Sequence, residues 1–198
     1  MRRRWLLAGG VALAGCSVLP QQAYVQRREW PLDVDRTPVL PPRARGRVLL
    51  VRSVRAAPGL ESRGLQWLQR DGSLHVDFYE QWAVPPAQAV EDDLRQWLGD
   101  AGLFRAVLAP GSRLDADLVL EGELDTFLAD LNAGVARASV ALVLLDQRPG
   151  TVKVLLQKTA TAEVTLTDTA PPGLVEALKA ALVAVFGKAE RDIAAAAR

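Results

Sequence analysis

The chain has 198 residues, and its 24 lysines and arginines nearly balance its 23 aspartates and glutamates, for a net charge of +1. These charges are interspersed and no basic block follows the first residues, which argues against a nucleic-acid-binding protein. The hydrophobic fraction of 49% and the periodic polar residues indicate one globular domain rather than a disordered chain.

The first residues have the pattern of an export signal. Three arginines at residues 2–4 precede a short apolar run that ends in Leu-Ala-Gly-Cys16, and this run is too short to span a bilayer as a helix. These last four residues resemble a bacterial lipobox, in which the cysteine is acylated and becomes the new N-terminus. We therefore predict a signal peptide over residues 1–15 and lipidation at Cys16. The alternative is an ordinary signal peptide with an accidental cysteine.

The residues after the signal predict an anchored tether. Cys16 is the only cysteine, so no disulfide holds the fold. In lipoproteins that the chain resembles, an aspartate after the cysteine retains the protein at the inner membrane, so Ser17 favours the outer membrane. Residues 16–46 are rich in proline, glutamine and arginine and predict a tether. Within it, Tyr24-Val25 and Trp30-Pro31-Leu32 are suited to a short edge strand or a clasp.

A hairpin is predicted in the first half of the domain. An apolar run over residues 48–51 predicts a strand covered on both faces, and residues 65–70 predict a second strand. Asp71-Gly72 favours a type I′ turn. The returning strand alternates. Its expected core face holds Leu74, Val76, Phe78 and Trp82, and its polar face holds His75, Asp77, Tyr79 and Gln81.

Two amphipathic helices and four further strands are predicted next. Pro85-Pro86 opens the first helix, which ends at Gly99 or Gly102, and Pro171-Pro172 opens the second. The strands are predicted at residues 104–107, 117–128, 135–145 and 152–166, the last three as an antiparallel meander. This order predicts an α+β domain over residues 47–198, an antiparallel or mixed sheet with two amphipathic helices packed on one face.

Few residues in the sequence support catalysis. His75 is the only histidine, and its place on the polar face predicts a solvated side chain. No Ser-His-Asp or Cys-His site is expected around it, since Cys16 is assigned to acylation. The close carboxylates at residues 91–93 and 115–117 suit a helix start and a turn better than a metal site, and no phosphate-binding loop is present. The sequence predicts no catalytic residue, no cofactor and no metal.

One part of the sequence is similar to a family of transport proteins. Residues 67–86 join an arginine at a strand end, an aromatic-rich strand and a Trp82-Ala-Val-Pro-Pro element before a helix. Gly102-Leu-Phe-Arg-Ala-Val107 and Asp117-Leu-Val-Leu-Glu-Gly122 follow in order. Together these elements resemble the ABC-type transport auxiliary lipoproteins, which accompany MCE-protein lipid transporters.

The resemblance implies a function and partners. It implies a non-enzymatic, outer-membrane lipoprotein that docks on an MCE-domain protein bridging the periplasm, and works through it with an ABC permease and an ATPase. Membrane attachment would come from acyl chains on Cys16. The resemblance is compatible with either a monomer or a homo-oligomer. The alternative is a lipid- or ligand-carrying envelope lipoprotein whose helices close over an apolar groove on the sheet. The sequence has no surplus of apolar residues for a large cavity, which favours docking.

Candidate partner contacts lie on the predicted hairpin. Trp82 and Trp97 fall on apolar faces and are expected in the core, whereas Trp67 stands beside a polar neighbour. Exposed aromatic and arginine side chains are enriched at interfaces. Trp67, Arg70 and Tyr79 are therefore the expected contacts, with core packing as the alternative for Trp67.

Overall fold

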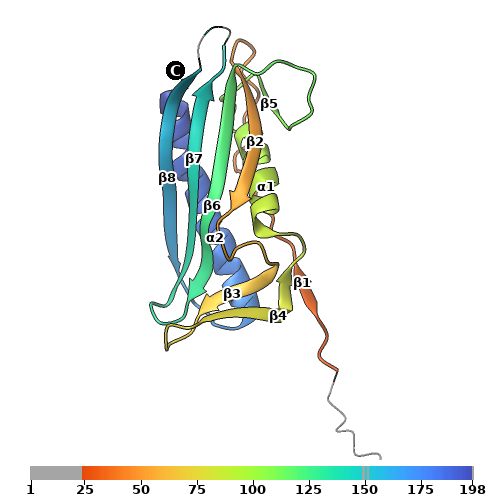
Figure 1. Cartoon of the computed structure of the whole chain (residues 1–198), viewed down its shortest axis with the longest axis vertical. Helices are drawn as coiled ribbons and strands as arrows, with labels where there is room; N and C mark the ends of the chain where they lie inside the picture. Colours follow the sequence, from red (N-terminus) through yellow and green to blue (C-terminus); the bar gives the residue numbers. More distant parts are fainter. Residues whose placement is uncertain (1–23, 149, 151, 198) are drawn as a thin grey trace, which may run out of the picture.

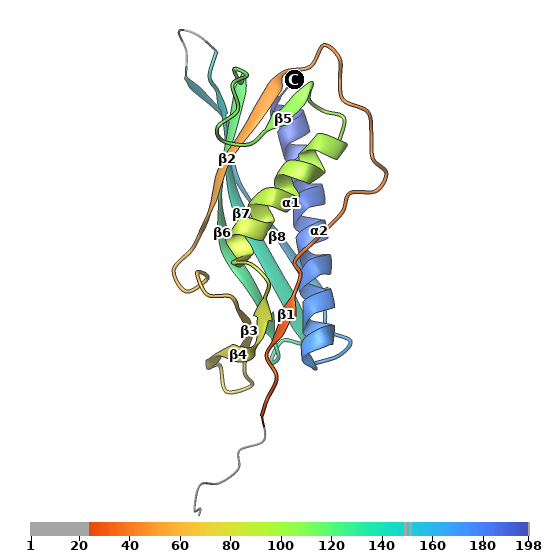
Figure 2. The ribbon, with the colours of Figure 1, turned by 90° about the vertical axis from the view of Figure 1, so that its right-hand side faces the viewer.

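The computed structural model describes residues 24–148, 150 and 152–197. One mixed sheet of eight strands is covered on one face by two helices (Figure 1 and Figure 2), which confirms the predicted α+β fold. The elements are β1 (Arg28–Trp30), β2 (Val48–Ala56), β3 (Gly64–Leu68), β4 (Leu74–Trp82), α1 (Pro86–Asp100), β5 (Ala106–Leu108), β6 (Leu118–Asp130), β7 (Val135–Asp146), β8 (Lys153–Thr165) and α2 (Pro171–Ala196). The predicted signal peptide and Cys16 lie outside the described residues.

Strand β6 is central because it has neighbours along both edges. On one edge it runs antiparallel to β7, which pairs antiparallel with β8, so the predicted meander is present. On the other edge, its first half pairs in parallel with β2, from Leu118 near Leu49 to Leu124 beside Ala56. Its last residues pair with β3. The β3–β4 hairpin therefore lies at the end of the sheet where β6 ends (Figure 1).

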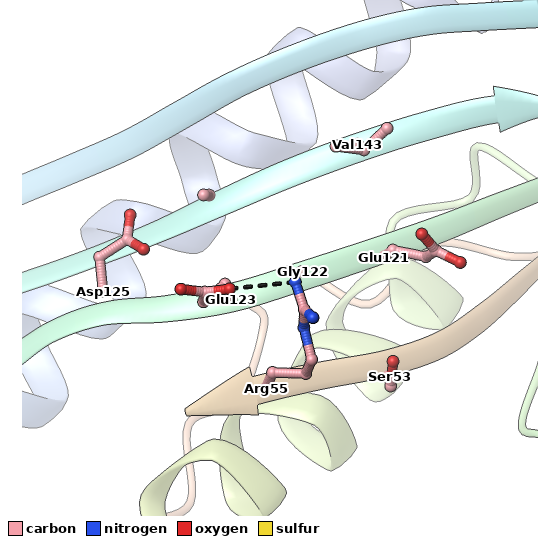
Figure 3. A pocket seen from close by; sticks show the side chains of 8 residues that line it. Ser53, Arg55, Glu121, Gly122, Glu123, Asp125 and Val143 are labelled. Atoms are coloured by element: carbon pink, nitrogen blue, oxygen red, sulfur yellow. Dashed lines mark hydrogen bonds and ion pairs between the residues drawn. The ribbon is translucent and has the colours of Figure 1, made fainter. Parts of the chain in front are cut away.

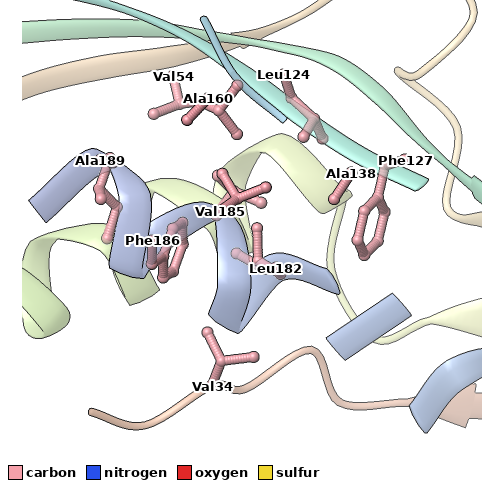
Figure 4. Close-up of a cluster of buried hydrophobic side chains, with 14 of the residues drawn as sticks. Val34, Val54, Leu124, Phe127, Ala138, Ala160, Leu182, Val185, Phe186 and Ala189 are labelled. Atoms are coloured by element: carbon pink, nitrogen blue, oxygen red, sulfur yellow. The ribbon is translucent and has the colours of Figure 1, made fainter. Parts of the chain in front are cut away.

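Each helix buries an apolar stripe against the sheet. A proline in the first turn of each helix has the φ angle that a helix needs. Helix α1 packs on β2, and α2 packs on β7 and β8. Figure 4 shows buried side chains of α2 facing apolar residues of the strands. The helices also meet each other, since the rings of Trp97 and Phe186 are edge to face with centroids 5.6 Å apart.

The predicted core face of β4 is wrong for three of its four residues. Trp82 is 2% exposed, as expected, but Leu74, Val76 and Phe78 are all exposed, Phe78 by 62%. A strict alternation would place all four on one side. An irregularity between Val76 and Trp82 changes the side to which the later residues point, so the first three side chains face away from the core.

Gly64 and Asp77 build this irregularity. Gln66 of β3 pairs with Val76, whereas Gly64 pairs with Gln81, so a step of two residues in β3 faces a step of five in β4. The Asp77 carboxylate accepts hydrogen bonds from two amides further along β4. A Cβ atom at Gly64 would lie 2.5 Å from the Asp77 carbonyl oxygen, so only glycine fits beside this bulge.

The hairpin turn lies where the sequence predicts it, but its type differs. A type I′ turn needs a positive φ at both central residues. Among the described residues only glycines have a positive φ, which is 84° at Gly72, so Asp71 does not meet this condition. The Gly72 amide donates to the Gln69 carbonyl at 3.0 Å, and the Gln69 amide donates to the Ser73 carbonyl at 2.9 Å. These bonds define a three-residue loop with glycine at its bulge position.

Residues 28–46, which the sequence predicts as part of a tether, instead lie along the domain and are called the strap. Strand β1 pairs in parallel with β4, so the edge strand considered at Trp30 is present. Leu32 and Val34 are buried, and Leu40 bridges to Ala101 at the end of α1. Burial of these apolar side chains explains why the strap packs instead of extending into water. Residues 16–23 of the predicted tether lie outside the described residues.

Candidate functional site

The apolar side chains that β4 turns outward gather on one surface. We call Leu74, Val76, Phe78 and Tyr79 the hairpin patch; each is between 43% and 62% exposed. The rings of Phe78 and Tyr79 meet edge to face with centroids 5.2 Å apart. The guanidinium carbon of Arg27 lies 4.3 Å from the centroid of the Phe78 ring. Exposed apolar and aromatic groups beside an arginine are typical of a contact surface.

The three predicted contact residues occupy different places on the hairpin. Trp67 is half-buried in β3, packs against the core and stacks on His75 with ring centroids 4.2 Å apart. Arg70 is exposed in the turn, and Tyr79 is exposed in the bulge against Phe78. The other members of the hairpin patch are not predicted by the alternation of β4, because the bulge interrupts that alternation. Gly64 was the available signal, since glycine inside a strand often marks a bulge.

The expected position of His75 on a polar face is wrong. It pairs with Trp67 across the hairpin and lies on the same side of the strands. Its Nε2 atom is 3.5 Å from the Asp77 Oδ2 atom, and its side chain is partly exposed. The bulge again accounts for the difference, because the faces of β4 are exchanged before it. Stacking against Trp67 gives His75 a packing role.

The sheet face that the helices leave uncovered is polar. A depression of about 450 Å³ lies over β2, β6 and β7, and Figure 3 shows the side chains that line it. Arg55 donates to Glu123 at 3.1 Å, and Arg52 donates to Glu121 at 2.7 Å. Burial, with the nearby charge of Glu123, raises the pKa of Asp125. Opposite charges paired across neighbouring strands suit a solvated sheet face.

Glu190 of α2 joins the strap to both helices. Its carboxylate accepts hydrogen bonds from Arg36 at 2.9 and 3.0 Å, and from the indole nitrogen of Trp97 in α1 at 2.8 Å. Burial works to raise the pKa of Glu190, but the hydrogen bonds from Arg36 and Trp97 outweigh it and lower that pKa. Glu190 is therefore a charged structural connection, which holds the strap across the seam between α1 and α2.

A second contact between strap and helix is acidic. The Asp93 carboxylate of α1 accepts a hydrogen bond from the Val34 amide, and its Oδ2 atom is buried without a hydrogen-bond partner among the described residues. Burial raises the pKa of Asp93 to about 7, and the charges of Asp33, Asp92 and Asp35 add to this shift. Asp33 also pairs with Lys179 of α2. The strap thus crosses α1 at a carboxyl group that titrates near neutral pH.

Because of Asp93, the free energy of unfolding is expected to fall as the pH rises from about 4 to about 7. The native state keeps the Asp93 proton up to about pH 7, whereas the unfolded chain releases it near pH 3.9, so the native state binds more protons in this range. Partial solvent access reduces the effect to about 1–2 kcal/mol. Asp93→Asn should remove this part of the pH dependence in urea unfolding at about pH 5 and about pH 8.

The matched control for this prediction is Asp92→Asn, which removes a carboxylate from the adjacent, exposed position. It should leave the pH dependence nearly unchanged. Asp93→Asn should stabilise the chain more at about pH 8 than at about pH 5. If the change in the free energy of unfolding is the same at both pH values, the titration does not belong to Asp93.

In the described part of the chain, apolar residues of the strap pack into the core beside both helices. Val34 of the strap lies on the side of α2 away from the strands, near Leu182 and Phe186 (Figure 4). Within residues 24–148, 150 and 152–197, no group of histidine, cysteine or acidic side chains could hold a metal ion. None of the helices described there is long and apolar enough to cross a membrane.

The sequence matches a family whose members share this arrangement. The model of the family described as ABC-type transport auxiliary lipoprotein component matches residues 31–188, which is most of the chain. The chain belongs to this family. The match begins inside the strap, so the transport auxiliary lipoprotein domain includes residues that the sequence analysis assigned to the tether. A search of curated proteins finds no significant match.

Solved structures support the fold of this auxiliary lipoprotein domain. Protein XCC0632 from Xanthomonas campestris has a TM-score of 0.72 at 22% identity, covering 85% of this chain and 96% of its own. An uncharacterized protein has a TM-score of 0.66 at 17% identity, covering 85% and 99%. The hypothetical protein CT253 from Chlamydia trachomatis has a TM-score of 0.51 at 12% identity, covering 76% and 99%.

Proposed function

We propose that the chain is a non-enzymatic lipoprotein component of an MCE-linked lipid transport system, anchored to the outer membrane through Cys16. It docks on a periplasmic MCE-domain protein, which connects it with an ABC permease and an ATPase. The observation that carries this proposal is the family match over residues 31–188. The described side chains support it, since their charged groups form structural pairs at the strap and on the sheet face.

The strap shortens the connection between the lipid anchor and the domain. With residues 28–46 held on the domain, the connection from Cys16 begins at Arg28, twelve residues later in the sequence. Twelve residues span at most about 40–43 Å. The anchor therefore keeps the domain near the membrane surface. The MCE-domain protein must extend across the periplasm to within that distance of the membrane.

Changing Cys16 to serine is expected to release the folded domain from the membrane fraction into the periplasm. Acyl chains contribute about 0.8 kcal/mol for each buried methylene group, so their loss removes the attachment. Fractionation after a high-salt wash, followed by urea unfolding of the released chain, measures both parts of this prediction. A Cys16→Ser chain that stays with the membranes would reject lipid anchoring. Ser17→Ala is the control and should remain anchored.

Docking is tested by binding of the purified chain to the periplasmic part of an MCE-domain protein from the same cell. We expect a stable complex and, in native mass spectrometry of the chain alone, no bound lipid. The filled seam between α1 and α2 motivates the second expectation. A stoichiometric lipid together with no affinity for the MCE-domain protein would reject docking and favour the lipid-carrying alternative.

A further inference from the structure

We propose that the hairpin patch rests on the lipid surface that holds the anchor, so that the β3–β4 hairpin is the membrane-facing end of the domain. This inference rests on the proposed lipidation of Cys16. It states what the hairpin patch contacts, namely the lipid surface. Neither the sequence nor the family match identifies that contact.

The first support is where the chain enters the domain. Strand β1 runs beside β4, with Arg28 paired to Glu80. One residue earlier, Arg27 lies over the ring of Phe78. Figure 1 and Figure 2 show residues 24–27 leaving the domain beyond β1, at the end that carries β3 and β4. The chain that leads to Cys16 therefore starts at the hairpin patch itself.

The second support is the length of that chain. Arg27 is eleven residues after Cys16 in the sequence, a stretch that spans at most about 36–40 Å. The strand β6, by comparison, has 13 residues and is about 43 Å long. An anchor at Cys16 can thus bring the hairpin to the lipid surface. The connection is shorter than β6, so it cannot reach the membrane from the hairpin if the domain stands with the opposite end of β6 on the lipid surface.

The third support is the chemistry of the hairpin patch. Leucine, valine and phenylalanine side chains suit the acyl boundary, and tyrosine suits the headgroup level. Arg27 lies over the Phe78 ring, and Arg70 is exposed in the turn of the same hairpin. Arginines in such places can lay their apolar stems on an apolar surface while their charged ends reach phosphate groups. Tyr24 and Val25, next to the exit of the chain, are also exposed.

The consequence is a fixed orientation of the domain. One weak apolar contact does not hold a protein on a membrane by itself, but it adds a second signal to a lipid anchor. Arg70 and Tyr79 then lie at the headgroups, so they are not available as contacts for a protein partner. The uncovered sheet face and the opposite end of the sheet remain accessible from the periplasm.

The test places a probe at the hairpin patch of the full, lipidated chain. Cys16 is the only cysteine and is blocked by acylation, so Phe78→Cys introduces a single free thiol for a polarity-sensitive fluorophore. Leu114→Cys is the control: Leu114 is an exposed apolar residue like Phe78, at 51% against 62%, and it lies in the loop before β6, at the other end of the sheet. Both variants are reconstituted in phosphatidylethanolamine–phosphatidylglycerol vesicles.

We expect a blue shift and a several-fold rise in emission at position 78, and no change at position 114. The change should be lost when Leu74→Ser and Val76→Ser are added, while the chain stays on the vesicles. Equal signals at the two positions would overturn the proposal. So would a signal at position 78 that appears only when the MCE-domain protein is added, which would make the hairpin a protein-docking surface. A chain that washes off the vesicles rejects the anchor itself.

Discussion

Replacing Trp82 with alanine is expected to lower the free energy of unfolding by about 3–5 kcal/mol, as large-to-small core substitutions do. Trp82 is 2% exposed, and its ring lies against Phe127 of β6 with centroids 5.3 Å apart. It also sits where β1, β4 and the sheet meet, since Trp82 pairs with Trp30. The loss of the ring leaves a cavity that these strands cannot close. Urea unfolding monitored by circular dichroism measures the change.

Phe78→Ala is the matched control for Trp82→Ala, because it removes another aromatic ring from the same strand. Phe78 is on the exposed side of the bulge, and its loss should cost less than about 1 kcal/mol. Similar losses for the two variants would mean that both rings lie in the core, which is what an uninterrupted alternation along β4 requires. A loss below about 1 kcal/mol for Trp82→Ala would place that ring at the surface.

The parts of the fold that repeat a simple period were predictable from the sequence. The alternation in β7 places Ala138, Val140 and Leu142 on the buried side, and these long antiparallel strands pair residue by residue over most of their length. The two helices start at the prolines that mark them. Periodic apolar faces and fixed proline angles are local properties, so no tertiary information is needed to recognise them.

The bulge in β4 depends on tertiary contacts and was not predictable in the same way. It requires Gly64 to approach the Asp77 carbonyl from a neighbouring strand. The turn predicts that β3 pairs with β4, but it does not predict the change of register that brings Gly64 opposite Gln81. One irregularity of this kind exchanges the two faces of a strand. The exchange turns Phe78 outward, and the three-residue turn sets the register that pairs His75 with Trp67. The candidate site could therefore be predicted only in part.

The strap illustrates the same limit. Its prolines and polar residues have the composition of a linker, and only Leu32 and Val34, two residues apart, indicate a buried edge. The groove that receives them exists only after α1 and α2 have packed on the sheet. Composition therefore predicts a tether for residues 28–46, although the folded domain buries Leu32 and Val34 of this segment in its core.

The connection at Glu190 predicts a large loss of stability on its removal. Glu190→Ala removes the acceptor of the Trp97 indole and the carboxylate partner of Arg36, whose side chain is 12% exposed and keeps only backbone carbonyl acceptors among the described residues. Removing one partner of a mostly buried ion pair costs about 3–5 kcal/mol. Because both side chains keep some solvent access, we expect about 2–3 kcal/mol. Urea unfolding measures the loss, and hydrogen exchange of the strap amides should increase in the same variant.

The control for Glu190→Ala is Glu176→Ala, which removes an exposed carboxylate from the same helix and should change the stability by less than about 0.5 kcal/mol. A double-mutant cycle with Arg36→Ala separates the pair from the helix, with an expected coupling of about 1–3 kcal/mol. If the coupling is absent, Glu190 acts only through Trp97. If Glu190→Ala is also as mild as Glu176→Ala, the strap is held by its other contacts, among them buried Leu32 and Val34 and the pairing of β1 with β4. Hydrogen exchange in the strap would then stay at its original rate.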